Sequence, residues 1–578
     1  MSSTGQQTLE RPDPARDDPA DSDGRVTSRR AAVSRRGLLT GIASSFAVAA
    51  CADIGSLDPS LLDPAAGDGA TPVPSEGATA SEAPSATPAP TTPPPAGAPV
   101  EPVLADDQVL HLLRRTTFGP TNAMVAGAQE AGVAAWLDAQ LAPESIDDST
   151  CEQRLARFPM LDKTARQIND TERDQGGQQR ADERLVDATV VRALCTERQL
   201  YEVMVEFWAN HLSIHTPSGD QWGRRTVADR EVYRPNALGR FADLLVASAK
   251  DPAMLTYLNN EDSCYEGDEA TVQENYGREL LELHTVGVDG GYTEEDVKNS
   301  AFILTGWTVD GDKVFRFDSG CHFVGPVQVL DFSHPNDSAD GGLAVGEAYL
   351  DHLAHHPATA TYLATKLIRR FVADEPPASL VETLAAVYLD NDTEIVPVLR
   401  ALFTSDEFAG SIGQKTRRPL EDIVASARAL GLAPRVQPNG DRPRSPVDVA
   451  YDLGQAPMNW GPPDGFPDVA APWLSSARLL GSWNYHWDLL EGRYDDWMES
   501  AGEALDQLID TAGIDTAGAL VDALTTRLLW QEVRPEDRAL LLEFAGLGDG
   551  DPIPDGQLAD LRVRVALAIL NSPYHLQR

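Results

Sequence analysis

Residues 199–215 read QLYEVMVEFWANHLSIH, and apolar side chains recur in this stretch at positions 200, 203/204, 207/208 and 211/212. A spacing of three to four residues places these side chains on one face of an α-helix. Similar runs follow along the chain, at 239–258, 271–287, 357–373, 378–389, 394–408, 418–431, 502–511, 516–530 and 559–571. The sequence therefore predicts a mainly α fold built from many helices.

One segment departs from this helical pattern. Apolar and polar residues alternate from Trp307 to Phe317 around the pair Asp310-Gly311, which is typical of a β-hairpin turn. Residues 327–330 (VQVL) are a candidate third strand. We therefore expect a multi-helix body with a small β-hairpin insert around residues 305–332.

The N-terminal region carries an export signal. Residues 34–39 read SRRGLL, the pattern of a twin-arginine signal, and the 14 residues 37–50 are uncharged. A membrane-spanning helix needs about 20 apolar residues, so this run is typical of a signal peptide. Residues 48–51 (VAAC) resemble a lipobox, in which Cys51 is the lipidated residue. We predict a signal peptide with a lipobox at residues 1–51; if Cys51 is not acylated, cleavage near residues 47–49 would release a soluble exported protein.

This leader determines the expected location and partners. The protein is expected to be exported and then anchored to the cell membrane by its lipid, or else free in the periplasm or outside the cell. The twin-arginine translocase is an expected partner. Residues 52–105 are rich in Pro, Ala and Thr and predict a disordered linker. Residues 106–578 form the predicted helical body, with two or three packed subdomains and a possible boundary near 410–440.

The charge of the chain limits its partners, and its cysteine content predicts disulfides. The chain has 47 Lys and Arg against 89 Asp and Glu, a formal net charge of −42, which excludes nucleic acid as a natural partner. Beyond Cys51 there are four cysteines, and an even number in an oxidising compartment suggests two disulfides with three possible pairings. Because neighbouring segments tend to pack together, we favour the pairs Cys151 with Cys195 and Cys264 with Cys321.

Two histidines in the opening stretch are candidate metal ligands. His211 and His215 are four residues apart, a spacing at which both imidazoles on a helix can reach one divalent metal ion. His322, beside the β insert, is a candidate to complete such a site. Met204 and Trp208 share the same helical face, so buried structural histidines are the alternative.

Residues 274–284 (ENYGRELLELH) hold the candidate catalytic carboxylates. Glu279 and Glu282 fall on one helical stripe, and Arg278 lies within one turn of Glu282. One reading is a carboxylate pair acting as metal ligand or general base, with Arg278 holding its charge. The other is an arginine–glutamate network that locks helices together.

Five blocks of the chain carry a family resemblance. They are residues 111–119 (HLLRRTTFG), 207–211 (FWANH), 274–307 with ELLELHTVG and LTGW, 356–360 (HPATA) with 366–367 (KL), and 463–467 (PDGFP). In these blocks the chain resembles the bacterial domain-of-unknown-function family 1800. The resemblance implies a mostly helical body in the cell envelope, often encoded beside a second exported protein, with no established activity. Residues 261–269 look inserted, and residues 460–462 (WGP) replace a more usual GWPT.

Two hypotheses for the function follow. The working hypothesis is a metal-dependent hydrolase of an envelope or extracellular polymer, in which the histidines and carboxylates above surround an activated water. The alternative is a lipid-tethered binding or assembly protein with no catalytic activity, whose tryptophans and residues 456–473 line a glycan or protein groove. The sequence contains no G-x-S-x-G, P-loop, Rossmann or C-x-x-C-H motif, so serine-elbow, nucleotide and c-type haem chemistry lack support.

Overall fold

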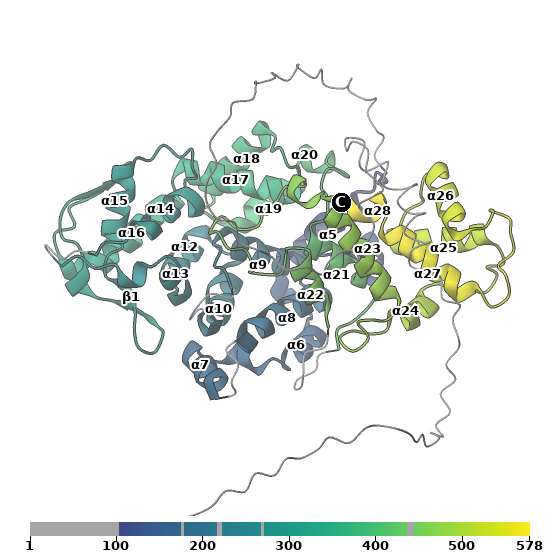
Figure 1. Cartoon of the computed structure of the whole chain (residues 1–578). Helices are drawn as coiled ribbons and strands as arrows, with labels where there is room; N and C mark the ends of the chain where they lie inside the picture. Colours follow the sequence, from purple (N-terminus) through teal and green to yellow (C-terminus); the bar gives the residue numbers. More distant parts are fainter. Residues whose placement is uncertain (1–102, 175–178, 217–221, 267–270, 436–443) are drawn as a thin grey trace, which may run out of the picture. The chain divides into compact units, whose positions relative to one another are not determined.

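The computed structural model describes residues 103–174, 179–216, 222–266, 271–435 and 444–578. The predicted signal peptide with Cys51, and the predicted linker up to residue 102, lie outside these ranges. Within them, no helix is long and apolar enough to cross a membrane. The prediction of a mainly α fold is confirmed: helices dominate, and the strands form two small antiparallel pairs (Figure 1).

The first described helix shows how local sequence sets a helix start. Asp107 precedes α3, and its Oδ1 accepts hydrogen bonds from the backbone N–H groups of Val109 and Leu110, at 2.9 and 3.0 Å. A carboxylate at this position satisfies N–H groups that the helix itself cannot. The elements of this part are α3 (Gln108–Thr116), α4 (Asn122–Ala131), α5 (Val133–Gln140), η2 (Pro143–Ser145), α6 (Ser149–Leu155), η3 (Pro159–Asp162), α7 (Ala165–Asp174) and α8 (Gln179–Cys195).

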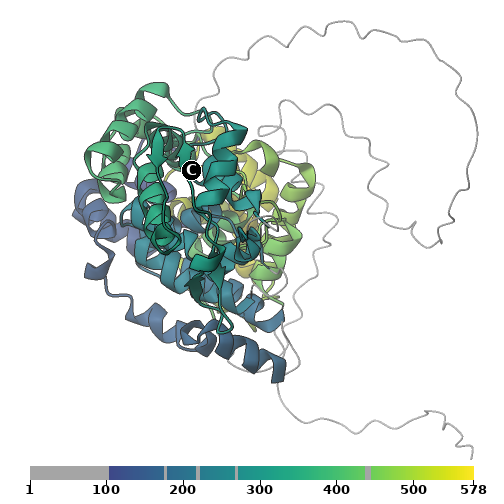
Figure 2. The ribbon, with the colours of Figure 1, turned by 90° about the vertical axis from the view of Figure 1, so that its left-hand side faces the viewer.

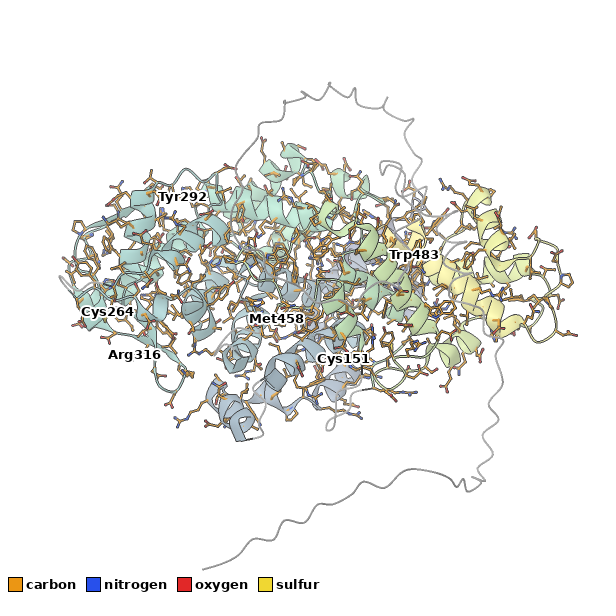
Figure 3. All side chains as sticks on the ribbon, viewed as in Figure 1. Cys151, Cys264, Tyr292, Arg316, Met458 and Trp483 are labelled. Atoms are coloured by element: carbon orange, nitrogen blue, oxygen red, sulfur yellow. A yellow bond between two sulfur atoms is a disulfide. The ribbon has the colours of Figure 1, made fainter. Side chains whose placement is uncertain are left out.

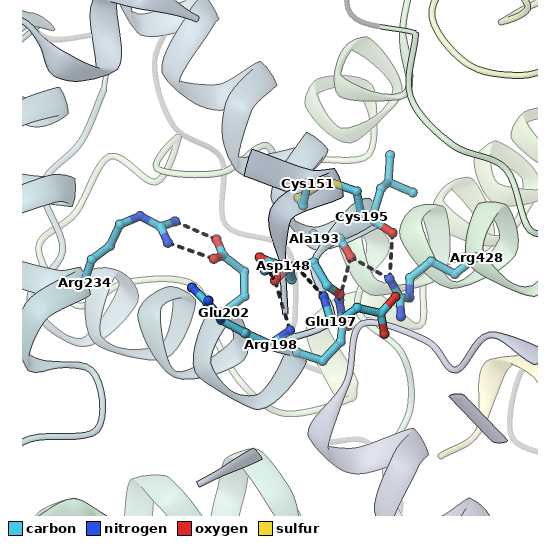
Figure 4. Close-up of a disulfide and its surroundings, with 12 residues drawn as sticks. Asp148, Cys151, Ala193, Cys195, Glu197, Arg198, Glu202, Arg234 and Arg428 are labelled. Atoms are coloured by element: carbon cyan, nitrogen blue, oxygen red, sulfur yellow. Dashed lines mark hydrogen bonds and ion pairs between the residues drawn. A yellow bond between two sulfur atoms is a disulfide. The ribbon is translucent and has the colours of Figure 1, made fainter. Parts of the chain in front are cut away.

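Two disulfides join neighbouring segments. Cys151 on α6 is bonded to Cys195 at the end of α8, and Cys264 is bonded to Cys321, the pairing that the sequence argument favours. Beside the first bond, Asp148 accepts hydrogen bonds from the Thr196 hydroxyl at 2.7 Å and the Glu197 backbone N–H at 2.8 Å (Figure 4). The junction of α6 and α8 is therefore held by both covalent and polar contacts.

The helix of the opening stretch is shorter than its periodicity predicts. It begins at Gln199 and ends at His211, so His215 lies beyond it. The run at 239–258 is divided into two helices because Pro252, which lacks an N–H, begins the second of them. The elements are α9 (Gln199–His211), α10 (Trp222–Ala228), η4 (Asp229–Tyr233), α11 (Arg234–Asn236), α12 (Phe241–Ala249), α13 (Pro252–Tyr257) and η5 (Asn260–Asp262).

The β insert contains the expected hairpin. Trp307 is opposite Phe317 and Val309 opposite Phe315 in an antiparallel pair. Residues 327–330 do not add a third strand to it; they contribute to a second antiparallel pair of their own. The elements are α14 (Glu274–Glu279), η7 (Leu280–His284), α15 (Glu294–Ile303), β1 (Trp307–Val309), β2 (Phe315–Phe317), η8 (Ser319–Cys321), β3 (Val327–Val329) and β4 (Phe332–His334). Figure 2 turns the side that carries α14, α15 and β1 toward the viewer.

Among the remaining helices, α21 is buried along its whole length and contacts α8, α22 and α23. This helix lies inside 410–440, where the predicted subdomain boundary stays a prediction. The elements are η9 (Ala339–Gly341), α16 (Gly342–Ala354), α17 (Pro357–Phe371), α18 (Ala378–Asp390), α19 (Ile395–Phe403), α20 (Asp406–Ala409), α21 (Pro419–Ala429), α22 (Pro446–Asp452), η10 (Ala471–Trp473), α23 (Ser476–Leu490), α24 (Ala501–Leu508), α25 (Ala517–Leu529), α26 (Pro535–Ala545), α27 (Leu558–Leu570) and α28 (Pro573–Leu576).

Candidate ligand-binding site

A cavity of about 270 Å³ lies between α9, α17 and the loop that follows α22. We call it the Lys366 cavity. Its lining includes charged, polar and aromatic side chains, among them Glu206, His211, Tyr362, Lys366, Trp460 and Asp464. A smaller hollow shares Glu206, Asn210, Trp460 and Phe466 with it and extends to Met458. Figure 3 marks the position of Met458.

The loop wall of the cavity is fixed by one asparagine on α9. The Asn210 side chain accepts a hydrogen bond from the Phe466 N–H at 2.7 Å and donates one to the Phe466 carbonyl at 3.0 Å. Gly465 has φ +76°, and a Cβ at this position would collide with the carbonyl oxygen of Asn210. Only glycine satisfies both the backbone conformation and the close approach. The PDGFP and FWANH stretches, distant in sequence, thus meet at the cavity.

Helix α17 supplies the opposite wall. His356 precedes the helix, and its Nδ1 accepts a hydrogen bond from the Ala358 N–H at 3.1 Å. Pro357 occupies the first helical position. Tyr362 and Lys366 are one turn apart and lie on the same face, with the Lys366 Nζ 5.5 Å from the centre of the Tyr362 ring. The helix therefore presents a tyrosine and a lysine together to the cavity.

Lys366 is the electrostatically distinctive residue of this site. Its half-buried ammonium makes no hydrogen bond or ion pair with any residue that the structure describes. Burial, with a smaller contribution from Arg369, lowers the pKa of Lys366 to about 8, against the opposing effect of Asp468 and Asp464. At neutral pH the group is therefore still mostly a cation.

The other charges at this end of the cavity are paired with each other. Glu206 and Arg418 line the cavity, and behind them lie Glu421, Arg370 and Arg578; we call these five residues the buried ion cluster. Arg418 Nη2 is 3.1 Å from a carboxylate oxygen of Glu206 and 3.1 Å from one of Glu421. Arg578 Nη1 is 2.9 Å from Glu421, and Arg370 contacts it as well. The three arginines outnumber the two glutamates, and Asp468, 3.8 Å from Arg370 and 3.7 Å from Arg418, supplies the third negative charge.

The pKa of Glu421 reflects this pairing. Its burial opposes ionisation, but Arg578, Arg418 and Arg370 outweigh that effect and hold its pKa well below the usual range. The carboxylate is therefore charged at any neutral or mildly acidic pH. The contrast within one site is plain: the charges of the cluster balance once Asp468 is included, while the Lys366 ammonium faces the cavity with no such partner.

Comparison with known proteins identifies the family of this chain. A family model described as "Protein of unknown function (DUF1800)" matches residues 111–576. The chain belongs to the DUF1800 family. No curated protein and no solved structure matches the chain. Every wall of the Lys366 cavity lies inside the DUF1800 region.

The three candidate histidine ligands of the DUF1800 body do not converge on one point. His211 Nε2 lies 3.0 Å from the His284 carbonyl oxygen, and its ring packs edge-on against Trp208 at 5.7 Å. Both ring nitrogens of His322 are engaged, one with the Thr305 carbonyl and one with the Asn336 side chain, each at 3.0 Å. Among the described residues, the groups whose ligand atoms converge include none of His211, His215 and His322.

The candidate catalytic carboxylates and Arg278 lie on α14 and η7. Arg278 binds Glu294 through two hydrogen bonds of 2.9 and 2.7 Å at the surface, and its charge acts on Glu279 as well. Glu279 is half-buried, and burial followed by repulsion from Glu282 and Asp464 raises its pKa. Glu279 and Glu282 therefore do interact electrostatically, and Asp464 of the cavity wall belongs to the same acidic group.

Sequence reasoning missed Lys366 and the buried ion cluster. Lys366 had one available signal, its presence in a family-like block beside Leu367. The cluster had none, because Glu206, Arg370, Glu421 and Arg578 lie on four separate segments and each resembles an ordinary surface charge in the sequence.

Proposed function

We propose that this protein is an exported envelope protein that binds a carboxylate-bearing group of an acidic polymer in the Lys366 cavity. The single observation that carries the proposal is the Lys366 ammonium, which faces a cavity without a hydrogen bond or ion pair in the described structure. An enclosed charge without a partner is unfavourable. A ligand carboxylate beside Lys366 would supply that partner as a charge-assisted hydrogen bond.

The size and lining of the cavity support a sugar-like ligand. Its volume of about 270 Å³ is close to the lower end of the roughly 300–1,000 Å³ of small-molecule pockets, so it suits one sugar residue or a chain end. Trp460, Phe466 and Tyr362 offer aromatic surfaces, and Asn210 and Asp464 offer polar atoms. An acidic sugar combines a carboxylate with the hydroxyl groups and apolar ring face that this lining matches.

The net charge of −42 repels an acidic polymer at long range. Salt limits this effect, since exposed charges are screened over about 8 Å at physiological ionic strength. The contact with Lys366 is local and enclosed, and it is screened much less. Binding is therefore expected to weaken little, or even to tighten, as salt is added.

The leader supports an envelope location for this binding activity. We infer export through the twin-arginine translocase and anchoring through a lipid on Cys51, with a second exported protein as a possible assembly partner. Cys51→Ser is then expected to move the protein from the membrane fraction to the soluble fraction on cell fractionation. An unchanged membrane fraction would contradict the lipid anchor.

Isothermal titration calorimetry of the purified body with D-glucuronate, and with glucose as the neutral probe, tests the proposal. We expect glucuronate to bind more tightly than glucose. Lys366→Met should weaken glucuronate binding about tenfold to hundredfold, the equivalent of one charge-assisted hydrogen bond. The matched control is Lys298→Met: Lys298 is exposed, and its Nζ lies 5.8 Å from the Phe302 ring, much as Lys366 lies beside Tyr362. Equal binding of the two sugars, or an unchanged affinity in Lys366→Met, would refute the proposal.

Hydrolysis of the same polymer is a second candidate, favoured by Glu279. A half-buried carboxyl group with a raised pKa, close to Glu282 and to Asp464 of the cavity wall, is suited to general acid catalysis. The hydrolase would not depend on His211, His215 and His322 as one ligand set, since their imidazoles face different partners. Glu279→Gln should abolish release of reducing sugar ends while glucuronate still binds; no release by the unmodified protein from any acidic glycan would exclude this candidate.

A further inference from the structure

A second group of polar side chains lies away from the cavity, where α21, α23 and α28 meet. Asp422, His486 and His575 offer three ligand atoms that all lie within 4.8 Å of one another, and all three residues are buried. Asp422 Oδ1 is 3.5 Å from His486 Nε2 and 3.3 Å from His575 Nε2. Neither histidine lines the Lys366 cavity.

The hydrogen bonds around His486 fix which of its nitrogens faces the group. The Asn571 amide nitrogen donates to the Leu567 carbonyl at 2.8 Å, so its oxygen faces His486 Nδ1 at 2.9 Å. Nδ1 must then carry the proton, which leaves a lone pair on Nε2. A second contact that fixes the outer nitrogen of a histidine is typical of metal sites.

The carboxylate of Asp422 is held in a similar way. Its Oδ2 accepts a hydrogen bond from the Ser482 hydroxyl at 2.6 Å and lies 3.4 Å from Arg478 Nη2. Its Oδ1, which faces the two histidines, accepts no hydrogen bond within the described ranges. An ionised, buried carboxylate oxygen without a donor carries a desolvation cost.

One hydroxyl group lies beside both imidazoles. Ser426 Oγ is 2.7 Å from His486 Nε2 and 3.1 Å from His575 Nε2, and also 2.8 Å from the Asp422 carbonyl oxygen. One hydroxyl proton serves only one of these acceptors at a time. In the tautomers that leave both Nε2 atoms unprotonated, their lone pairs converge with Asp422 Oδ1, and a cation there would satisfy all three atoms together.

We propose that Asp422, His486 and His575 bind one structural zinc ion. A tetrahedral zinc with bonds of about 2.0–2.1 Å has ligand atoms about 3.3–3.4 Å apart. The two carboxylate-to-imidazole distances, 3.5 and 3.3 Å, fit those edges. Imidazole ligands select zinc-like ions over Ca²⁺ and Mg²⁺, which prefer all-oxygen sites.

The position of the site indicates a structural role that goes beyond ligand binding in the cavity. The Asp422 and His486 side chains are 0% exposed and His575 is 4% exposed, so a polymer has no access to the ion. The ion would fasten α28, the last helix, to α21 and α23. Arg478 and Arg417 lie nearby and oppose a further positive charge, so the two imidazoles and the carboxylate are all needed for tight binding.

Metal analysis of the mature protein, purified without a histidine tag, tests this site. We expect about one zinc per chain, and cobalt(II) in its place should give the visible absorption bands of a tetrahedral site. Asp422→Asn and His575→Gln should each reduce zinc to about a tenth of an ion per chain or less, which follows from loss of one ligand in three. His352→Gln is the control, because His352 pairs with Asp331 at 2.7 Å in a histidine–aspartate group on the surface.

A second experiment uses the unmodified protein and therefore does not depend on the folding of the variants. Treatment with a chelator should lower its Tm, and added zinc should restore it. The proposal is overturned if the protein holds no zinc as purified and takes up neither zinc nor cobalt on incubation. It is also overturned if zinc remains in the Asp422 and His575 variants but leaves on His352→Gln.

Discussion

Two arginine–glutamate ion pairs in this protein have similar distances but differ strongly in solvent exposure. Arg278 holds Glu294 at 2.7 Å, and Arg578 holds Glu421 at 2.9 Å. The side chain of Glu294 is 78% exposed, whereas that of Glu421 is 1% exposed. Ion pairs in water contribute little, while removal of one partner from a buried pair leaves an uncompensated charge. Burial, and not the presence of a pair, thus decides which of the two regions the fold depends on.

The largest expected effect comes from breaking the buried region. Glu421→Gln removes the charge that Arg370, Arg418 and Arg578 share, and we expect it to lower the free energy of unfolding by about 3–5 kcal/mol. Urea unfolding followed by circular dichroism measures this loss. A change below about 1 kcal/mol would mean that the buried ion cluster does not hold the fold together.

A second prediction extends the comparison to histidines and pH. Burial, with Arg115 beside His111 and Lys366 beside His284, lowers the pKa of each of these two histidines to about 3. The folded state keeps both neutral while the unfolded chain takes up protons below about pH 6.5, so stability is complete above that pH and falls as the pH decreases. The loss is about 1.4 kcal/mol per pH unit for each histidine.

The Tm measured from pH 7.5 to 4.5 checks this prediction. It should begin to fall near pH 6.5, before the carboxylates of the buried ion cluster are protonated. The partly exposed His355, whose pKa is raised by its contacts with Asp351 and Asp392 against the effect of burial, serves as the control, and His355→Gln should leave the curve nearly unchanged. A Tm that stays constant down to pH 5 would contradict the neutral state of the buried histidines.

The smallest effect is expected at the surface pair. Arg278→Ala and Glu294→Gln should leave the urea midpoint unchanged within error, because the pair lies at the surface, with Glu294 78% and Arg278 34% exposed. The same urea titration as for Glu421→Gln measures them. If either variant were destabilised as much as Glu421→Gln, the distinction between the two regions would fail.

The sequence predicts the helices and strands better than it predicts the site, because only the helices and strands follow from local patterns. Helical periodicity and the Asp310-Gly311 turn are local patterns, and α17, α18, α21, α25 and the hairpin follow them closely. The expected pairing of His211 with His215 required the helix to continue, and α9 ends at His211.

The cavity, in contrast, is assembled from residues that local patterns do not connect. Glu206, Lys366, Arg418 and Asp464 come from four segments of the chain. A buried lysine or glutamate carries no mark in the sequence that separates it from a surface one. Only the packing of α9 and α17 against the loop at Gly465 makes a candidate site of them.

The central claim is that the Lys366 ammonium binds a ligand carboxylate, and the pH dependence of glucuronate affinity tests it most directly. Because the pKa of Lys366 is about 8, affinity should fall as the pH rises above about 8 in the unmodified protein. Lys366→Arg, which keeps its charge, should bind glucuronate with no such fall up to pH 9.5. An affinity that is constant from pH 7 to 9.5 in the unmodified protein, or that falls equally in Lys366→Arg, would contradict the account.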